Sequence, residues 1–273
     1  MSLPLLVRSK LCWHYHGVPD VCWYLGYANY SSIDRQNAYI DDMDRFDADT
    51  ATLNILNEHL CSPFIGEFMA SPMHQGRLKM LGDFIVRLKD RGKKVAIVYV
   101  DCPPADDAVY PFWRYADRLA QFIEIATPPL AQLADAFILG IETNRGPLSV
   151  ELVEYGIDLI RKHAFRMVDG YKLVLPVGNH EQNVGYDSKG RLRMTRRAPR
   201  NADFIGFETS NHPYWGYEVP VSKMRDEVAF LVAHSNATPV WVMESNNLED
   251  AHARKQNRAM AALPGVIGVS GPL

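Results

Sequence analysis

Two glutamates follow strongly apolar segments at distant points of the chain. Glu142 ends the segment FILGIE, and Glu244 ends the segment PVWVME. If both segments are strands of one parallel barrel, both carboxylates leave the strands at the same edge, where such barrels carry their active sites. Two carboxyl groups about 5 Å apart can hydrolyse a glycosidic bond in two steps, one donating a proton while the other attacks the sugar. Their surroundings must then keep one carboxyl protonated and the other ionised.

The two-residue period of a strand predicts which faces carry these glutamates. Gly140 shares a face with Glu142, and Val240 and Val242 share a face with Glu244. We expect these faces of small or branched residues to line the interior, so that both carboxylates point into the mouth of the fold.

Short β-branched runs alternate with longer stretches at helical period along the whole chain. This alternation is typical of β/α units around a parallel sheet. The predicted strands are residues 10–15, 50–56, 94–100, 136–141, 172–177, 203–207, 239–243 and 265–269. The predicted helices are residues 33–46, 76–91, 111–126, 149–163, 221–235 and 248–263.

Eight strands with helical crossovers in a chain of 273 residues predict a (β/α)8 TIM barrel. A doubly wound sheet is the alternative, but the residues after the first strand, His14 to Val18, contain no G-x-G-x-x-G turn. No internal repeat or Ser/Gly linker divides the sequence, so residues 1–273 are predicted to form a single domain.

Two β/α units depart from this pattern. Residues 179–202 contain a hairpin turn signal at 187–190 and no apolar stripe, so we expect a hairpin in place of a regular fifth helix. Only four residues follow the last predicted strand, so a regular eighth helix is also expected to be missing. We expect amino-terminal residues, a second copy of the chain or a larger assembly to cover the open flank.

Composition limits the classes of partner. The formal net charge is -3, so no global basic field attracts polyanions and general nucleic-acid binding is excluded. Four cysteines without a C-x-x-C pair suit free thiols in a reducing compartment and exclude zinc fingers. The sequence shows neither a signal peptide nor a run long enough to span a membrane, which predicts a soluble, cytoplasmic chain without a membrane partner.

The two glutamates, together with His212-Pro213-Tyr214 after the sixth strand, resemble the clan A glycoside hydrolases. The segment ending in Ile141-Glu142 is similar to the β-mannanase-like families, which lack the Asn found before the acid/base in many clan members. The resemblance implies a carbohydrate substrate, no cofactor and no metal. It also implies that Glu142 is the general acid/base, Glu244 the nucleophile, Tyr214 its hydrogen-bond partner and His212 part of the pocket.

Several further residues are expected to bind the sugar. Because the Asn before the acid/base is missing, Asn144, Asn179 and Asn246 are the candidates for its contact to the sugar 2-hydroxyl. The tryptophan that clan members usually carry after strand eight is also missing, and Trp215 is the strongest candidate for a stacking platform. Trp13 and Trp113 are expected to be barrel or helix packing instead.

Charged groups near other strand ends compete for a role. Glu208 follows strand six and is expected to be a pocket residue that tunes its neighbours. Glu58 and Asp101, after strands two and three, are weaker candidates. His14 and His16 are expected to donate hydrogen bonds on the substrate side or to be packed.

Two alternatives remain open. His14-x-His16 with His180 and His212 resembles the metal site of amidohydrolase barrels, in which a divalent ion activates water. The aspartate that follows strand eight in that group is missing here. The other alternative is a non-catalytic glycan-binding barrel within a larger assembly.

A basic stretch follows strand five. Its cations are Lys189, Arg191, Arg193, Arg196, Arg197 and Arg200. It is interpreted either as a solvated loop or as a grip for an acidic glycan.

Overall fold

The computed structural model describes residues 12–14, 32–45, 49–57, 72–101, 112–139, 150–165, 173–179, 184–194, 197–208, 220–235, 238–244 and 251–269. Its main sheet has eight parallel strands in the order β1-β2-β3-β4-β5-β8-β9-β10. Their bounds are β1 (Cys12–His14), β2 (Thr50–Asn57), β3 (Lys94–Asp101), β4 (Ala136–Leu139), β5 (Leu173–Asn179), β8 (Ile205–Glu208), β9 (Val240–Glu244) and β10 (Val266–Val269).

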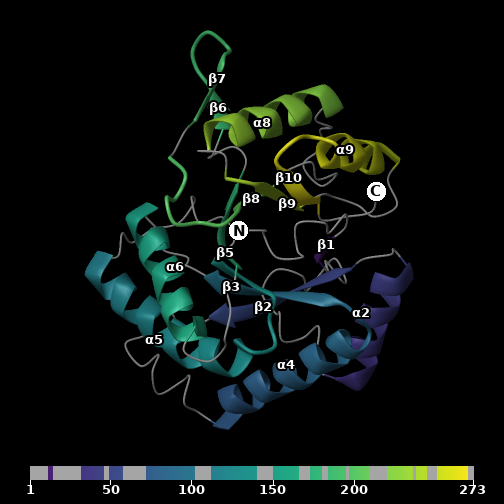
Figure 1. The fold of residues 1–273 in the computed structure, drawn as a ribbon, viewed down its shortest axis with the longest axis vertical. Coiled ribbons are helices and arrows are strands. Elements are labelled where there is room, and N and C mark those ends of the chain that lie inside the picture. Colours follow the sequence, from purple (N-terminus) through teal and green to yellow (C-terminus); the bar gives the residue numbers. More distant parts are fainter. Residues whose placement is uncertain are drawn as a thin grey trace.

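Six helices of the described chain lie around these strands (Figure 1). Helices α6, α5, α4 and α2 cover strands from the first half of the sequence, while α8 and α9 lie beside β8, β9 and β10. Their bounds are α2 (Ile33–Arg45), α4 (Pro72–Asp90), α5 (Phe112–Leu130), α6 (Val150–Phe165), α8 (Val221–His234) and α9 (Ala251–Ala261).

The predicted order of strands and helices is confirmed, and the differences are confined to the ends of elements. Helix α5 runs beyond the predicted residue 126 and includes Pro128 and Pro129 in its last turns. The strands follow each other in chain order across the sheet, which differs from the reversed order of a doubly wound sheet. Strand β1 also approaches β9, so the two ends of the row of strands lie near each other. None of the described helices is both long and apolar enough to cross a membrane.

Apolar side chains on one face of the sheet pack against the helices. We call this the outer face. Between β2–β4 and helices α2, α4, α5 and α6, it contributes Ala51, Leu53, Val95, Ile97, Tyr99, Phe137 and Leu139 to one core. Against α8 and α9, it contributes Ile205, Val240, Val242 and Val269 to a second core.

The opposite face, which we call the inner face, carries the residues that alternate with these. Ala96, Ala136, Ile138 and Trp241 are buried there and belong to neither of the two helix-packed cores. Because side chains alternate between faces along a strand, the inner face can be followed from strand to strand through the register of backbone pairing.

A hairpin follows β5, as predicted. Strands β6 (Val184–Tyr186) and β7 (Leu192–Met194) pair antiparallel, and in Figure 1 they project beyond α8 at the top of the view. The Asp187 carboxylate accepts hydrogen bonds from the backbone N–H groups of Lys189 and Arg191, both at 2.9 Å. Gly190 has a φ of 71°, which suits a glycine. The described residues between β5 and β8 form no helix, and the absence of a regular fifth helix stays a prediction.

Helix α6 approaches β4 and α5 closely at Gly156. A Cβ atom at this position would lie 2.5 Å from Cδ2 of Leu139 and 3.2 Å from Cδ2 of Leu119. A glycine in a helix normally costs about 0.5–1 kcal/mol relative to alanine. The close contact with two buried leucines is therefore the structural reason for glycine at this position.

We predict opposite effects for two Gly→Ala substitutions in helices. Gly156→Ala should lower the free energy of unfolding by about 1–2 kcal/mol, because overpacking outweighs the gain in helix propensity. Gly76→Ala in α4 should raise it by about 0.5–1 kcal/mol, because a Cβ there has nothing within 4 Å. Urea unfolding followed by circular dichroism measures both changes. Stabilisation by Gly156→Ala would show that α6 does not approach the sheet as described.

Candidate active site

Three polar residues end neighbouring strands at the same level of the sheet. Asn179 of β5 is the register partner of Glu208 of β8, and Glu208 is the register partner of Glu244 of β9. Adjacent strands lie about 4.8 Å apart, so these three backbone positions form a continuous row. We call Asn179, Glu208 and Glu244 the strand-end row. It lies at the carboxyl edge of a parallel sheet, where (β/α)8 enzymes hold their active sites.

The strand-end row lies on the inner face. The register pairs Ala136 and Ile138 of β4 with Leu173 and Leu175 of β5. Continuing the alternation along β5 places Asn179 on the same face as those two buried residues, away from the helices. Asn179 pairs with Glu208, and Glu208 pairs with Glu244, so all three register positions lie on that face.

An irregularity in β9 is required for this placement. Phe207 pairs with Val242 and Glu208 pairs with Glu244, so Met243 is an extra residue between two paired positions. Such a bulge changes the face on which the following residue lies. Val240 and Val242 belong to the core formed with α8 and α9.

The alternation expected from the sequence is therefore wrong for β9. The valines of this strand face the helices and do not line the interior, because the outward packing against α8 and α9 requires branched apolar residues. Glu244 nevertheless reaches the inner-face register position, because the bulge at Met243 shifts the alternation by one residue.

A tryptophan that the sequence interpretation did not consider lies on the inner face two pairs before the row. Trp241 is 1% exposed, and its ring meets that of Phe204 edge-on at 6.5 Å. Its register partners on the two neighbouring strands are Gly206 and Gly268. Two flanking glycines leave room for the indole, so Trp241 fills the interior behind the strand-end row. The sequence signal for this arrangement was a glycine two residues before Glu208 on one strand and a tryptophan between two valines on the next strand.

Strand β1 contributes one more predicted residue to the inner face. His14 pairs with Thr52, and Trp13 pairs with Ala51, which packs against the helices. The register thus places the backbone position of His14 on the inner face and that of Trp13 on the outer face. Asp101 continues the alternation of Val95, Ile97 and Tyr99, so its register position is on the outer face and outside the row.

The remaining predicted site residues lie outside the described residues. Strand β4 ends at Leu139, three positions before Glu142. The predicted approach of Glu142 to Glu244 therefore stays a prediction. The others outside the described ranges are His16, Glu58, Trp113's side chain, Asn144, His180, His212, Tyr214, Trp215 and Asn246.

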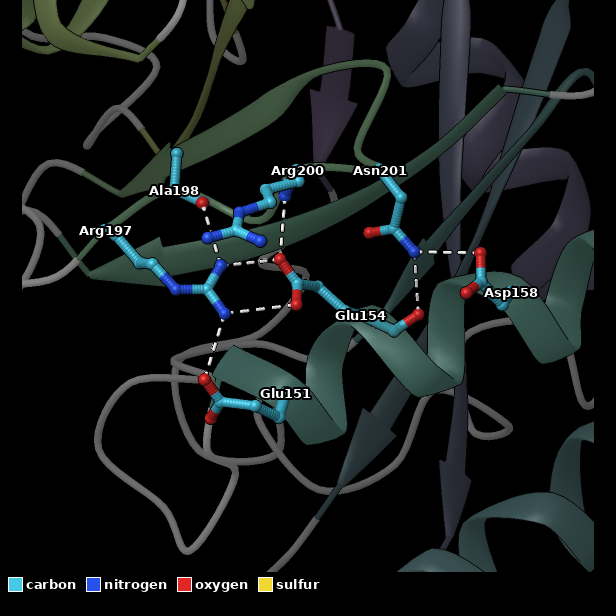
Figure 2. A network of polar contacts seen from close by, with 7 residues as sticks. All are labelled: Glu151, Glu154, Asp158, Arg197, Ala198, Arg200 and Asn201. Carbon is cyan, nitrogen blue, oxygen red and sulfur yellow. Dashed lines mark hydrogen bonds and ion pairs between the residues drawn. The ribbon is translucent and has the colours of Figure 1, made fainter.

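The basic stretch is partly used to hold the chain together. Residues 197–203, which we call the strap, run along α6 between the hairpin and β8 (Figure 2). The Arg197 guanidinium donates to Glu151 Oε1 at 2.9 Å and to both carboxylate oxygens of Glu154. The Arg200 backbone N–H donates to Glu154 Oε1 at 2.9 Å.

Two further contacts continue the strap along α6. The Asn201 amide donates to the Glu154 carbonyl oxygen at 2.8 Å and to Asp158 Oδ1 at 2.9 Å. Arg161 of α6 pairs with Asp203 at 2.9 Å. The strap is therefore held along one flank of α6 by polar contacts.

Because of these contacts, some cations of the basic stretch are already paired within the chain and are not available to bind an acidic glycan. Arg197 is engaged with two carboxylates of α6, and Arg191 pairs with Asp187 at 2.8 Å inside the hairpin. Hydrogen bonding by Arg197 holds the pKa of Glu154 below its ordinary value, and backbone hydrogen bonding by Arg191 does the same for Asp187. At least two of the six cations thus have structural roles within the chain.

The metal-site alternative receives no support from the side chains that the structure describes. Among them, no group of three histidine, cysteine, aspartate or glutamate residues lies close enough to hold a metal ion. The histidines on which that alternative depends lie outside these side chains, so it stays untested.

Comparisons with known proteins identify the fold. No family model matches the sequence, and no curated protein matches it either. Among solved structures, an exo-β-1,4-mannosidase, Op5Man5 from Opitutaceae bacterium strain TAV5, matches 97% of this chain with a TM-score of 0.67 at 14% identity. The chain covers 52% of that protein, or about half of its length.

Two further structures show the same fold at similar distance. A GH5_18 protein from Bifidobacterium longum subsp. longum, solved with Manβ1-4GlcNAc, matches 97% of this chain and 68% of its own, with 12% identity and a TM-score of 0.68. A GH113 β-1,4-mannanase matches 97% of this chain and 87% of its own, with 12% identity and a TM-score of 0.61. The resemblance to clan A and its β-mannanase-like families is thus confirmed for the fold.

We predict that Arg197→Ala lowers the free energy of unfolding at pH 7 by about 1 kcal/mol, through loss of a forked ion pair. The folded-state pKa of Glu154 is below its ordinary value of 4.5, so the stabilisation is complete above pH 4.5 and is lost as the pH falls through the folded-state value. The difference from the unsubstituted protein should therefore shrink below pH 4.5.

Urea unfolding at pH 7, 5 and 3 measures this difference. Arg225→Ala is the matched control, because Arg225 forms only a longer, exposed contact of 3.4 Å with Asp226, and it should change stability by less than about 0.5 kcal/mol. A deficit for Arg197→Ala that is the same at pH 3 and pH 7 would contradict the assigned role of Glu154.

Proposed function

We propose that the protein is a retaining glycoside hydrolase with Glu142 as general acid/base and Glu244 as nucleophile. The observation that carries the proposal is the inner-face register position of Glu244 at the carboxyl end of β9, level with Glu208 and Asn179. The fold shared with mannosidase and mannanase structures supports it.

We also propose that the eight strands close into a barrel. The chain-order arrangement of the strands and the approach of β1 to β9 support closure. In this architecture the hairpin and the strap take the place of the fifth helix, and the inner face becomes the barrel interior. A closed interior would bring the region after β4, which contains Glu142, opposite β9.

The reaction would proceed in two displacements. In the first, Glu142 protonates the departing glycosidic oxygen while the Glu244 carboxylate attacks the anomeric carbon and forms a glycosyl ester. In the second, Glu142 removes a proton from water, and the water displaces Glu244 from the sugar with net retention. No cofactor takes part in either step.

The strand-end row gives Glu208 and Asn179 distinct proposed roles. Glu208 is the register neighbour of the nucleophile, and two carboxylates at adjacent positions repel each other when both are ionised. Glu208 is therefore proposed to tune the charge of the pocket. Asn179, at the other end of the row, is a candidate for a hydrogen bond to a sugar hydroxyl, together with Asn144 and Asn246.

The aromatic and histidine residues after β8 complete the proposed pocket. Tyr214 would hydrogen-bond the nucleophile, His212 and Trp215 would line the sugar site, and His14 and His16 would contribute from the first strand. The β-linked substrates in the names of the similar structures make β-1,4-mannan and β-1,4-glucan the first substrates to test.

We predict that Glu244→Gln abolishes release of reducing ends from a susceptible glycan, by at least about 10³-fold, because an amide cannot form the glycosyl ester. The fold should persist, since the substitution preserves size at a strand end. Screening β-1,4-mannan and β-1,4-glucan for new reducing ends, with circular dichroism as the folding check, tests this prediction.

Glu208→Gln is the matched control for Glu244→Gln, because the two residues are register partners on adjacent strands. It should alter the rate but leave measurable turnover. If Glu244→Gln retains activity, or if Glu208→Gln is the variant that loses it, the nucleophile assignment is wrong.

The acid/base role predicts a dependence on the leaving group. Glu142→Ala should slow hydrolysis of a glycan strongly but spare the first step on an aryl glycoside with an acidic phenol, because such a leaving group needs no proton. Burst kinetics of phenol release measure this difference. Equal losses on both substrates would assign Glu142 a different role.

A further inference from the structure

The hairpin places an aromatic ring close in sequence to the strand-end row. Tyr186 at the end of β6 follows Asn179 of the row by seven residues. An extended chain spans at most about 3.5 Å per residue, so the two positions lie within about 25 Å of each other. The hairpin packs against α8 and projects beyond it at the top of Figure 1. An oligosaccharide of several sugar units is long enough to span that distance.

The ring of Tyr186 is exposed, yet its position is fixed. The residue is 42% exposed, while its hydroxyl donates a hydrogen bond to Glu227 Oε1 of α8 at 2.9 Å. Glu227 is only 2% exposed, so the anchoring carboxylate belongs to the packed interior between the hairpin and α8. Burial and the Glu227 hydrogen bond raise the pKa of Tyr186 to about 12, so the phenol keeps its proton and donates throughout the neutral range.

A cation lies next to the ring. Lys223 in the first turn of α8 places Nζ 5.2 Å from the Tyr186 ring centroid and 3.9 Å from Glu227 Oε1. Its side chain is 48% exposed, so the ammonium also faces solvent. Asp187, the next residue along the chain, pairs with Arg191 at 2.8 Å.

We propose that Tyr186 is a stacking platform for a sugar unit distant from the cleaved bond, with Lys223 donating hydrogen bonds to the hydroxyls of that sugar. The proposal rests on the proposed function for its ligand class, a β-1,4-linked glycan. A rigid aromatic face offers an apolar surface to the C–H groups of a pyranose, and polar groups at its rim suit the hydroxyls. The Tyr186 side chain loses little conformational entropy when a sugar binds, because its hydroxyl is already held by Glu227.

The surroundings of the ring favour a sugar over a protein partner. Protein docking surfaces are contiguous apolar patches, often of several hundred Å². The side chains shown to contact Tyr186 are charged. The other large apolar side chains described as exposed, Ile33, Val86 and Tyr155, lie on three other elements: α2, α4 and α6.

Binding is measured in the Glu244→Gln background, so that cleavage does not consume the probe. Soluble β-1,4-mannan and β-1,4-glucan serve as probes in affinity electrophoresis. Tyr186→Ala should weaken binding of the better probe about 5–10-fold, through loss of stacking. Tyr186→Phe should bind within about twofold of the background protein, because the ring remains, although its melting temperature should fall with the lost hydrogen bond to Glu227.

Tyr155→Ala is the matched control, because Tyr155 is 39% exposed on α6 and lies outside the hairpin. It should leave binding unchanged. Equal weakening by Tyr186→Phe and Tyr186→Ala would show that the hydroxyl only anchors the hairpin, and it would overturn the proposal. Unchanged binding in Tyr186→Ala, or no binding of either probe by the background protein, would overturn it as well.

Catalysis on a small substrate separates this proposal from the proposed function. In the otherwise unsubstituted protein, Tyr186→Ala should keep its kcat/KM on an aryl monoglycoside, which cannot reach the hairpin, and lose it only on long glycans. If the protein binds a glycan through Tyr186 but hydrolyses none, the proposed function fails while the platform stands.

Discussion

Backbone pairing between β8 and β9 determines on which face of the sheet the last register position of β9 lies. The valines of β9 are needed on the outer face, where they pack with Met224, Val228 and Leu231 of α8. Strict alternation after them would direct Glu244 toward the same helices. Met243 is an extra residue in β9 that shifts the alternation. The valines can therefore face the helices while the register position of Glu244 lies on the opposite face.

The inner face is consistent with this arrangement. Gly206 and Gly268 flank Trp241 on both sides, so the largest side chain of β9 fills the space that its neighbours leave empty. The buried Trp241 ring therefore lies on the inner face two pairs before the strand-end row.

Polar contacts hold the strap along the flank of α6. A fifth helix would bury an apolar stripe against α6, whereas the strap uses Arg197, Asn201 and Asp203 to reach charged and backbone groups of that helix. Exposed ion pairs stabilise less than apolar burial does. The chain between β5 and β8 also contains the hairpin, in which Tyr186 is anchored on α8 through its hydrogen bond to Glu227.

The sequence by itself determined the order of strands and helices, the hairpin turn at Asp187 and the positions of polar residues at strand ends. Those features depend on local periodicity and turn chemistry, which short segments contain. Only the tertiary structure decided which face Glu244 occupies, which cations hold the strap, and that Trp241 lies between two glycines. A bulge is defined by the pairing of two strands, and an ion pair such as Arg197–Glu154 joins residues 43 positions apart. Neither can be read from the period of a single segment, because each depends on which distant backbone lies alongside.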